Sequence, residues 1–263
     1  MKAWKRIQIT KKRAACGVLG LLLLAAAYMG VPRAAEKVFA VAEGERRLPI
    51  YCVQTEKPQV SVSFDAAWGA DDTDELLRIL KENDVKATFF LCGYWVEKYP
   101  EEVKKIAAEG HDLGNHSATH PHMSRISSEE IAQELQKCHE NVKKLTGVEM
   151  ELFRPPFGEY DNHVIETAEQ NGYYTIQWDV DSLDWKEQGA EVEIRQVLEH
   201  KHLGNGSIIL FHNDAKYTPK VLDTILKGIK EKGFEIVPIS QLIHRENFEM
   251  DHEGRQIPKG KDV

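Results

Sequence analysis

The sequence has 263 residues, with 34 Lys and Arg against 42 Asp and Glu. Seven of the basic residues and none of the acidic ones lie in residues 1–33, which leaves 27 basic against 42 acidic residues in 34–263. A body this acidic would be repelled by a phosphate backbone, so nucleic-acid binding is a poor hypothesis. With 42% hydrophobic and 29% charged residues, the chain is neither a disordered tail nor a small stapled scaffold.

The N-terminal 33 residues carry a membrane-targeting pattern. Residues 14–31 hold no charged side chain and follow six basic residues, Lys2, Lys5, Arg6, Lys11, Lys12 and Arg13. The uncharged stretch is close to the roughly 20 residues that span a bilayer. Arg33 stands where signal-peptide cleavage requires a small residue, so an uncleaved anchor is favoured over a cleaved signal. The basic prefix predicts a cytoplasmic N-terminus and an extracellular body, which would be secreted if the segment were cleaved.

Hydrophobic patterning predicts alternating strands and helices after a connector at 34–57 that holds one strand, 48–53. Further strands are expected at 60–64, 87–91, 111–114, 151–154, 173–179, 207–211 and 234–237. Helices are expected at 73–83, 100–109, 127–146, 162–171, 190–200 and 219–232. This alternation predicts parallel βαβ units in one domain, 58–245, as an α/β barrel or a doubly wound sheet. The polar tail, 246–263, is expected to be loose.

The helix at 127–146 has the clearest boundaries. Ser127 and Glu130 have the spacing of a capping box, which satisfies the free N–H groups of a first helical turn. Gly147 follows the last turn and is typical of a helix end.

The four cysteines give little constraint. Cys16 lies in the uncharged N-terminal stretch, which leaves Cys52, Cys92 and Cys138 in the body. Three cysteines allow at most one disulfide. Because no CxxC spacing occurs, buried thiols are favoured over a disulfide framework or a metal cluster.

Polar residues stand directly after several of the expected strands. They are Asp65, His116, His120, Arg154, Asp181, Asp184 and His212. The carboxyl ends of parallel strands form one face of an α/β fold, so these distant residues are expected to meet at one site.

His116 and His120 form the strongest metal-ligand pattern. Two imidazoles four residues apart can face one ion from a single turn of chain. Pro121 disfavours helix at His120, so a loop is expected. By itself the pair is equally compatible with two surface histidines.

Each of the other residues has a structural interpretation beside the catalytic one. Asp65 could form a turn, and Arg154, which opens the segment RPPFG, could form a structural salt bridge. His212 ends a strand with a fully apolar pattern and could be a core histidine. Asp181 and Asp184 place two carboxylates on one loop.

In this order, the segments SFDAAWG, NHSATH, RPPFG, DSLDW and LFH resemble the five motifs of the polysaccharide deacetylases, the NodB-homology domain of carbohydrate esterase family 4. The resemblance covers about residues 58–243. It implies a distorted (β/α)7 barrel and metal-dependent removal of N-acetyl groups from an aminosugar polymer. Anchored members commonly act on cell-wall polymer, which implies N-acetylglucosamine or N-acetylmuramic acid of peptidoglycan as the substrate.

The resemblance also implies roles for the residues at the matching positions. Asp65 would be the base that takes a proton from metal-bound water, and Arg154 would keep this carboxylate oriented and ionised. His116 and His120 would hold the ion. The backbone N–H of Phe157 would help to stabilise the oxyanion.

The remaining roles concern the leaving group and the substrate. His212 would protonate the sugar nitrogen as it leaves. A carboxylate of the DSLDW loop, Asp184 in preference to Asp181, would raise the pKa of His212 so that it can donate. Trp185 and Leu210 would form an apolar wall for the sugar and the acetyl methyl group.

One position departs from the family pattern. The first motif normally has two adjacent aspartates, the second of which binds the metal, and here the second position is Ala66. The third ligand could come from Asp71, Asp72 or water, or the ion could be held weakly. Two histidines suit Zn²⁺, with Co²⁺ or Ni²⁺ as alternatives, better than they suit Mg²⁺ or Ca²⁺.

The sequence therefore predicts a membrane-anchored hydrolase that deacetylates a polysaccharide. Two alternatives stay open. One is a non-catalytic cell-wall carbohydrate-binding protein that has lost a metal ligand at Ala66. The other is an O-acetyl esterase, which would use the same side chains on a different polysaccharide.

Overall fold

The computed structural model describes residues 46–259, of which residues 47–259 lie in one compact unit. The expected membrane segment, 14–31, lies outside the described residues. Among the helices of 46–259, none has the length and apolar character that a bilayer crossing requires.

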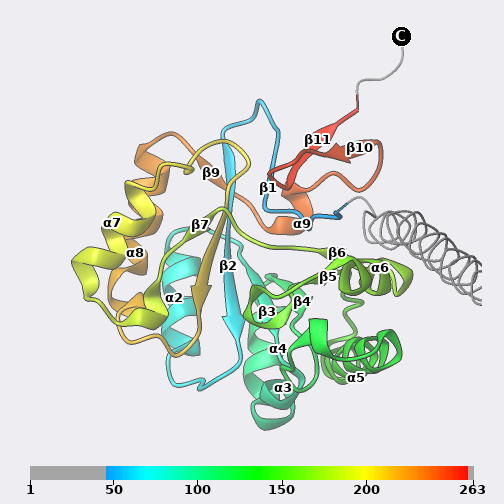
Figure 1. The fold of residues 1–263 in the computed structure, drawn as a ribbon. Helices are drawn as coiled ribbons and strands as arrows, with labels where there is room; N and C mark the ends of the chain where they lie inside the picture. The colour runs from blue at the N-terminus through cyan, green and yellow to red at the C-terminus, as the bar shows by residue number, and fades with distance from the viewer. Residues whose placement is uncertain (1–45, 260–263) are drawn as a thin grey trace, which may run out of the picture. The chain divides into compact units, whose positions relative to one another are not determined.

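A sheet of parallel strands forms the centre of this unit (Figure 1). The strand order is β6 (Tyr174–Thr175), β5 (Leu152–Phe153), β4 (Asp112–Asn115), β3 (Thr88–Leu91), β2 (Gln59–Ala66), β8 (Ile208–His212) and β7 (Val180–Asp181). The short strand β9 (Glu235–Ile236) pairs with the start of β2. All of these pairings are parallel, as the alternation of strands and helices predicts.

The sheet is an open half-barrel, which bears out the parallel α/β architecture of the expected distorted (β/α)7 barrel but not a complete ring of strands. The end strands β6 and β7 follow each other in sequence, yet within residues 46–259 no ladder joins them. The predicted single strand at 173–179 is interrupted because the chain leaves the sheet after β6. Ile176 there forms a parallel bridge with Ile50 of the connector.

Helices cover the outer side of the strands (Figure 1). They are α2 (Thr73–Glu82), α3 (Gly93–Lys98), α4 (Pro100–Ala108), α5 (Ser128–Thr146), α6 (Asn162–Gln170), α7 (Ala190–Leu198) and α8 (Thr218–Glu231). Three single turns of 3-10 helix are η1 (Met123–Arg125), η2 (Pro156–Gly158) and η3 (Asp184–Lys186).

Helix α5 has the boundaries expected from its sequence. The Ser127 side chain accepts the N–H of Glu130, and the Glu130 carboxylate accepts the N–H of Ser127. Gly147 ends the helix with a left-handed backbone at φ 75°. Its buried stripe packs into the core between helices and sheet; the stripe consists of Ile131, Leu135, Cys138 and Val142.

Helix α3 was not expected, and its position depends on a close backbone approach. Gly93 N donates to Ser117 O, and Tyr94 N donates to Ala118 O. A Cβ added at Gly93 would lie 2.8 Å from Ala118 Cα. The start of α3 can therefore lie against the loop after β4 only because residue 93 has no side chain.

The two faces of strand β2 are buried in different surroundings, one apolar and one polar. Val60, Val62 and Phe64 face the core under the helices, whereas Ser61, Ser63 and Asp65 alternate with them and face the inner side of the sheet. The buried hydroxyls are satisfied, because Ser61 donates to Val237 O and Ser63 donates to Ile209 O. This polar inner row ends at Asp65.

Residues 246–259 are ordered, which corrects the expectation of a loose tail over this part of 246–263. After the short helix α9 (Ile239–Leu242), β10 (Phe248–Met250) and β11 (Arg255–Pro258) form a second, three-stranded sheet with β1 (Cys52–Val53). Within this polar sequence, Gln256 is fully buried and anchors the segment. Its side-chain amide donates to His244 O and accepts from His244 N.

The three cysteines of the body are buried free thiols, as expected. Burial raises the pKa of Cys52 and of Cys92 to about 12. Thiols of this kind are unreactive at neutral pH.

Replacing Gln256 with Ala should lower the free energy of unfolding by about 1–3 kcal/mol, because both hydrogen bonds to residue 244 are lost in a buried place. Urea unfolding followed by circular dichroism measures this loss. Glu253→Ala, an exposed change on the same segment, is the control. Equal midpoints for the two variants would contradict an anchoring role for Gln256.

Candidate active site

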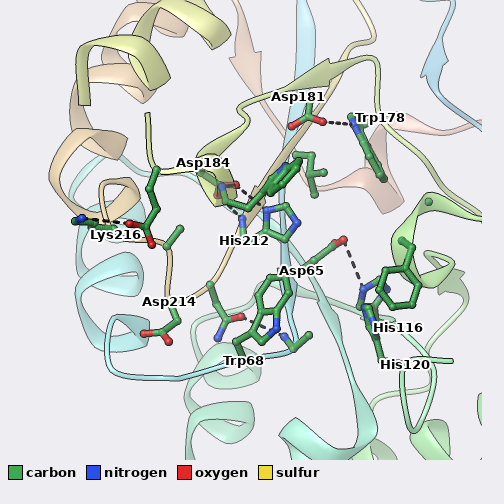
Figure 2. A pocket seen from close by; sticks show the side chains of 18 residues that line it. Asp65, Trp68, His116, His120, Trp178, Asp181, Asp184, His212, Asp214 and Lys216 are labelled. Atoms are coloured by element: carbon green, nitrogen blue, oxygen red, sulfur yellow. Dashed lines mark hydrogen bonds and ion pairs between the residues drawn. The ribbon is translucent and has the colours of Figure 1, made fainter. Parts of the chain in front are cut away.

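The register of β2 and β8 brings two of the expected residues together. Asp65 and His212 are Cα partners across this parallel pair. Both strands end here, so the two side chains open into a pocket of about 780 Å³. In Figure 2, Asp65 lies between His212 on one side and the pair His116 and His120 on the other.

Nearly all of the sequence-predicted residues line this pocket. The lining includes Asp65, His116, His120, Phe157, Asp181, Asp184, Trp185, Leu210 and His212. Arg154 lies behind this wall, where it is fully buried. Asp71 and Asp72 are not part of the lining.

Arg154 holds the Asp65 carboxylate by a buried ion pair. Its Nη1 donates to Asp65 Oδ1 at 2.7 Å, and its Nη2 donates to Gln177 O at 3.2 Å. The guanidinium lies 4.1 Å from the centre of the Phe90 ring. Burial by itself favours the neutral acid, but the charge and the hydrogen bond of Arg154 help to outweigh it, and the pKa of Asp65 is lowered below its ordinary value.

A strained loop after β4 presents the two imidazoles. Ser117 and His120 both have a left-handed backbone, with φ 66° and 57°. The turn is fixed by side chains, because Asn115 Oδ1 accepts Ser117 N and Ser117 Oγ accepts His120 N. Strain of this kind persists only where surrounding contacts hold it, and it is common at functional sites. The expected loop at His120 is therefore confirmed.

Both imidazoles favour their neutral form, and a hydrogen bond orients the ring of His116. His116 Nδ1 donates to Arg154 O at 2.7 Å, which leaves the lone pair on Nε2, 3.7 Å from Asp65 Oδ2. The rings of His116 and His120 are 4.9 Å apart. Burial lowers the pKa of His116 and lowers that of His120 to about 4. Neutral imidazoles are the form that binds a metal ion.

The described residues supply two imidazole ligands and no complete metal cluster. In 46–259 there is no group of three or more His, Cys, Asp or Glu side chains arranged to hold an ion. Ala66 is buried at the end of β2 and brings no ligand atom. Asp72, considered as a replacement, instead accepts the backbone N–H of Asp214. The donor set thus fits a divalent ion at two positions and falls short of the usual three.

On the opposite wall of the pocket, Asp184 binds and orients His212. Asp184 Oδ1 accepts His212 Nδ1 at 2.7 Å, and Oδ2 accepts the His212 backbone N–H at 2.6 Å. Burial alone would lower the pKa of His212, but the hydrogen bond and the charge of Asp184 outweigh it and raise the pKa. The Nδ1 bond leaves Nε2 as the free nitrogen of this ring.

Asp181 lies in the pocket wall but makes other contacts. Its Oδ2 accepts Trp178 Nε1 at 3.2 Å, and its Oδ1 accepts Leu183 N at 2.9 Å. It therefore acts on His212 through charge and without a hydrogen bond. This difference agrees with the preference for Asp184 over Asp181 as the partner of His212.

Phe157 lies at the rim with an exposed ring. Its backbone has φ 59° between two prolines and Gly158, and its side chain is 57% exposed. The ring contacts His120 edge-on at 4.5 Å and stacks on His122. Within residues 46–259 its N–H has no backbone acceptor.

Two tryptophans in the wall were missed from the sequence. Trp68 is 56% exposed and its ring lies 5.5 Å from that of His212. Trp178 faces the pocket beside the buried Arg154 guanidinium. Trp68 stands three positions after Asp65, so its place in the first motif was the available signal.

The pocket thus combines an ionised carboxylate, an imidazole that favours its protonated form, two neutral imidazoles and an aromatic rim. A carboxylate and an imidazolium whose pKa values are pushed in opposite directions can accept one proton and donate another near neutral pH. Hydrolysis of an acyl bond requires both transfers.

Comparison with known proteins identifies the family. A sequence profile described as polysaccharide deacetylase matches residues 53–176. The uncharacterized protein YlxY of Bacillus subtilis is 36% identical over 195 residues, which are 74% of this chain and 60% of that protein. A peptidoglycan-N-acetylglucosamine deacetylase of Bacillus cereus is 34% identical over 190 residues, which are 71% of this chain and 68% of that enzyme.

A solved structure shares the fold. BA3943 from Bacillus anthracis, described as a pseudoenzyme of carbohydrate esterase family 4, has a TM-score of 0.71 and 32% identity. The match covers 81% of this chain and 73% of that one. A mutant of BA3943 is described as having restored enzymatic activity. On this sequence and fold similarity, the chain belongs to the polysaccharide deacetylase family, the hydrolases of carbohydrate esterase family 4.

Proposed function

We propose that this protein hydrolyses N-acetyl groups of cell-wall peptidoglycan, at N-acetylglucosamine or N-acetylmuramic acid. Support comes from the B. cereus relative named above and from a 29% identical peptidoglycan-N-acetylmuramic acid deacetylase of B. subtilis. The membrane anchor at 14–31 and the extracellular location are parts of this proposal, and they rest on the sequence pattern alone.

One observation carries the catalytic proposal: the β2 and β8 register that places Asp65 beside His212. Asp65, held ionised by Arg154, accepts a proton from the attacking water. His212, whose pKa is raised by Asp184, donates its proton to the departing sugar nitrogen. An amide requires this second transfer because an unprotonated amine is a poor leaving group.

The other residues bind the substrate and the developing charge. The Phe157 N–H, which has no backbone acceptor among the described residues, donates to the oxyanion. Leu210 and Trp185 contact the acetyl methyl group and the sugar ring, since both line the pocket beside His212. Trp185 is 55% exposed and can stack on a sugar face.

A divalent ion, with Zn²⁺ first and Co²⁺ or Ni²⁺ as alternatives, would be held by His116 and His120. Such an ion supplies a Lewis acid that polarises an acyl oxygen and lowers the pKa of water. The missing carboxylate at Ala66 makes this site weaker than a three-ligand site.

A second candidate function is carbohydrate binding without turnover. The observation that favours it is Ala66, together with the similarity to a protein described as a pseudoenzyme. Retention of Asp65, Arg154, Asp184 and His212 in bonded pairs favours catalysis, because sugar binding needs neither an ionised base nor a tuned proton donor.

Acetate release from peptidoglycan, chitin oligomers and acetylated xylan separates these functions. Asp65→Asn and His212→Gln should each lower kcat/KM on peptidoglycan by about 100-fold or more, because each removes one proton transfer. His252→Gln, an exposed change outside the pocket, is the control. Release from xylan alone would indicate an O-acetyl esterase, and peptidoglycan binding without any release would indicate the binding protein.

Asp184→Asn should move the alkaline limb of the pH profile to lower pH. The reason is that Asp184 raises the pKa of His212, and His212 must be protonated to act. NMR titration of the His212 ring measures the same shift without turnover. Asp181→Asn should give a smaller decrease, because Asp181 makes no hydrogen bond to His212. An unchanged His212 titration in Asp184→Asn would contradict this role.

Ala66→Asp should strengthen metal binding by about tenfold or more, because it offers a third ligand beside the two imidazoles. The rise in melting temperature with added Zn²⁺, together with metal content after dialysis, measures this change. The double replacement His116→Ala with His120→Ala should abolish the rise. Stoichiometric zinc retained equally by wild type and Ala66→Asp would show that another group already completes the site.

A further inference from the structure

A buried carboxyl lies behind the pocket and has no part in the chemistry proposed above. Glu193, on α7, is 3% exposed. Its Oε1 accepts the Thr218 hydroxyl at 2.8 Å, and its Oε2 is buried without a hydrogen-bond partner. The Glu193 carboxyl is therefore isolated from solvent, and its hydrogen bond within the described residues is the one from Thr218.

That contact leads back to the proposed proton donor. Thr218, at the start of α8, is fully buried, and its hydroxyl also lies 3.3 Å from Asp184 Oδ2. Asp184 in turn binds both the ring and the backbone N–H of His212. Side chains from α7, α8, η3 and β8 therefore form one continuous chain that ends at His212.

We infer that Glu193 and Thr218 are positioning residues that act through Asp184, and that the charge on Glu193 sets how firmly His212 holds its proton. The consequence for catalysis rests on the proposed function, in which His212 is the proton donor. The coupling itself is a property of the folded protein and can be measured without substrate.

A single hydroxyl proton makes the coupling directional. The Thr218 hydroxyl lies within reach of two carboxyl groups but has one proton, so it donates to one of them at a time. When Glu193 is ionised, the hydroxyl donates to Glu193. When Glu193 is protonated, it donates to Thr218 Oγ1, and the hydroxyl proton turns to Asp184.

These two arrangements have opposite effects on His212. A hydroxyl that donates to Asp184 partly satisfies that carboxylate and weakens its hold on the His212 proton. An ionised Glu193 removes this donor and adds a second negative charge behind Asp184. Ionisation of Glu193 therefore raises the pKa of His212.

Glu193 changes its charge in the useful pH range. Burial raises its pKa to about 7, and the charge of Asp184 adds to the increase. As the pH rises through this value, Glu193 ionises and His212 holds its proton more firmly. The proton donor would thus stay charged to higher pH than Asp184 alone allows.

The carboxylates that act on Glu193 and on His212 raise both pKa values. Asp184 on η3 is the charged group that acts on Glu193. His212 faces Asp184, Asp65 on β2 and Asp181 on β7. Each of these carboxylates raises the pKa of His212 by its negative charge. Removing the negative charge of Glu193 should therefore lower the pKa of His212.

The test is an NMR titration of the His212 ring in the full-length chain, with its signal assigned by His212→Gln. Glu193→Gln keeps the shape and the hydrogen bond but not the charge, and it should lower the pKa of His212 by about half a pH unit or more. Glu191→Gln removes the same charge from an exposed position on α7 and should leave the titration unchanged.

Thr218 provides the second arm, which also serves if Glu193→Gln fails to fold. Thr218→Val leaves Glu193 buried without a partner, which keeps it protonated, so the pKa of His212 should fall as in Glu193→Gln. Thr218→Ser retains the hydroxyl and should retain the wild-type titration. Adding Glu193→Gln to Thr218→Val should cause little further shift.

A wild-type His212 titration in folded Glu193→Gln, or in folded Thr218→Val, would overturn the inference. An equal shift in Glu191→Gln would also overturn it, because the effect would then be general surface charge. If the wild-type protein releases no acetate but the pKa of His212 still falls in Glu193→Gln and Thr218→Val, the proposed function is contradicted and the coupling is supported.

Discussion

The buried ion pair between Arg154 and Asp65 is the contact on which the pocket depends. Arg154 is fully buried and donates to the Asp65 carboxylate, while its own backbone carbonyl accepts the His116 ring. Two buried charges gain little net stability, but removing either one leaves the other uncompensated. The pair therefore keeps Asp65 ionised in an apolar surrounding. The backbone carbonyl of Arg154 also binds His116 Nδ1, so that Nε2 is the nitrogen of His116 that faces the pocket.

The pocket separates two opposite electrostatic environments across a single strand pair. On the β2 side, a cation lowers the pKa of a carboxyl, and on the β8 side, a carboxylate raises the pKa of an imidazole. His116 and His120 differ from both of these groups, because burial lowers their pKa values and favours their neutral form. The acid, the base and the candidate ligands are thus distinguished by their surroundings and not by residue type alone.

Position 66 shows that family membership and a complete catalytic set are separate properties. The fold, the ion pair and the Asp184 to His212 bond are all in place, yet the residue beside Asp65 is alanine. Two imidazoles without a carboxylate ligand would hold a divalent ion less firmly than a three-ligand site does.

Much of the fold and of the pocket could be predicted because the relevant signals are local. Period-2 alternation in residues 60–64 placed Asp65 at the end of a strand, and the Ser127 and Glu130 spacing placed the start of α5. Parallel strands share one carboxyl-terminal face, so polar residues after different strands could be assigned to one site. The free, buried state of the three cysteines followed from their number and spacing.

The rest depended on contacts between segments far apart in the chain, which no local pattern encodes. Ile176, within a predicted strand, pairs instead with Ile50 of the connector, and Gln256 anchors a C-terminal segment with a polar sequence. The two hydrogen bonds from His212 to Asp184 depend on the loop geometry, and Asp72 accepts the backbone N–H of Asp214 instead of lining the pocket. Local sequence pattern indicated which polar residues follow most of the strands, because strand periodicity and turn residues are short-range signals. Tertiary packing decided which strands are neighbours, and so which buried charges face one another.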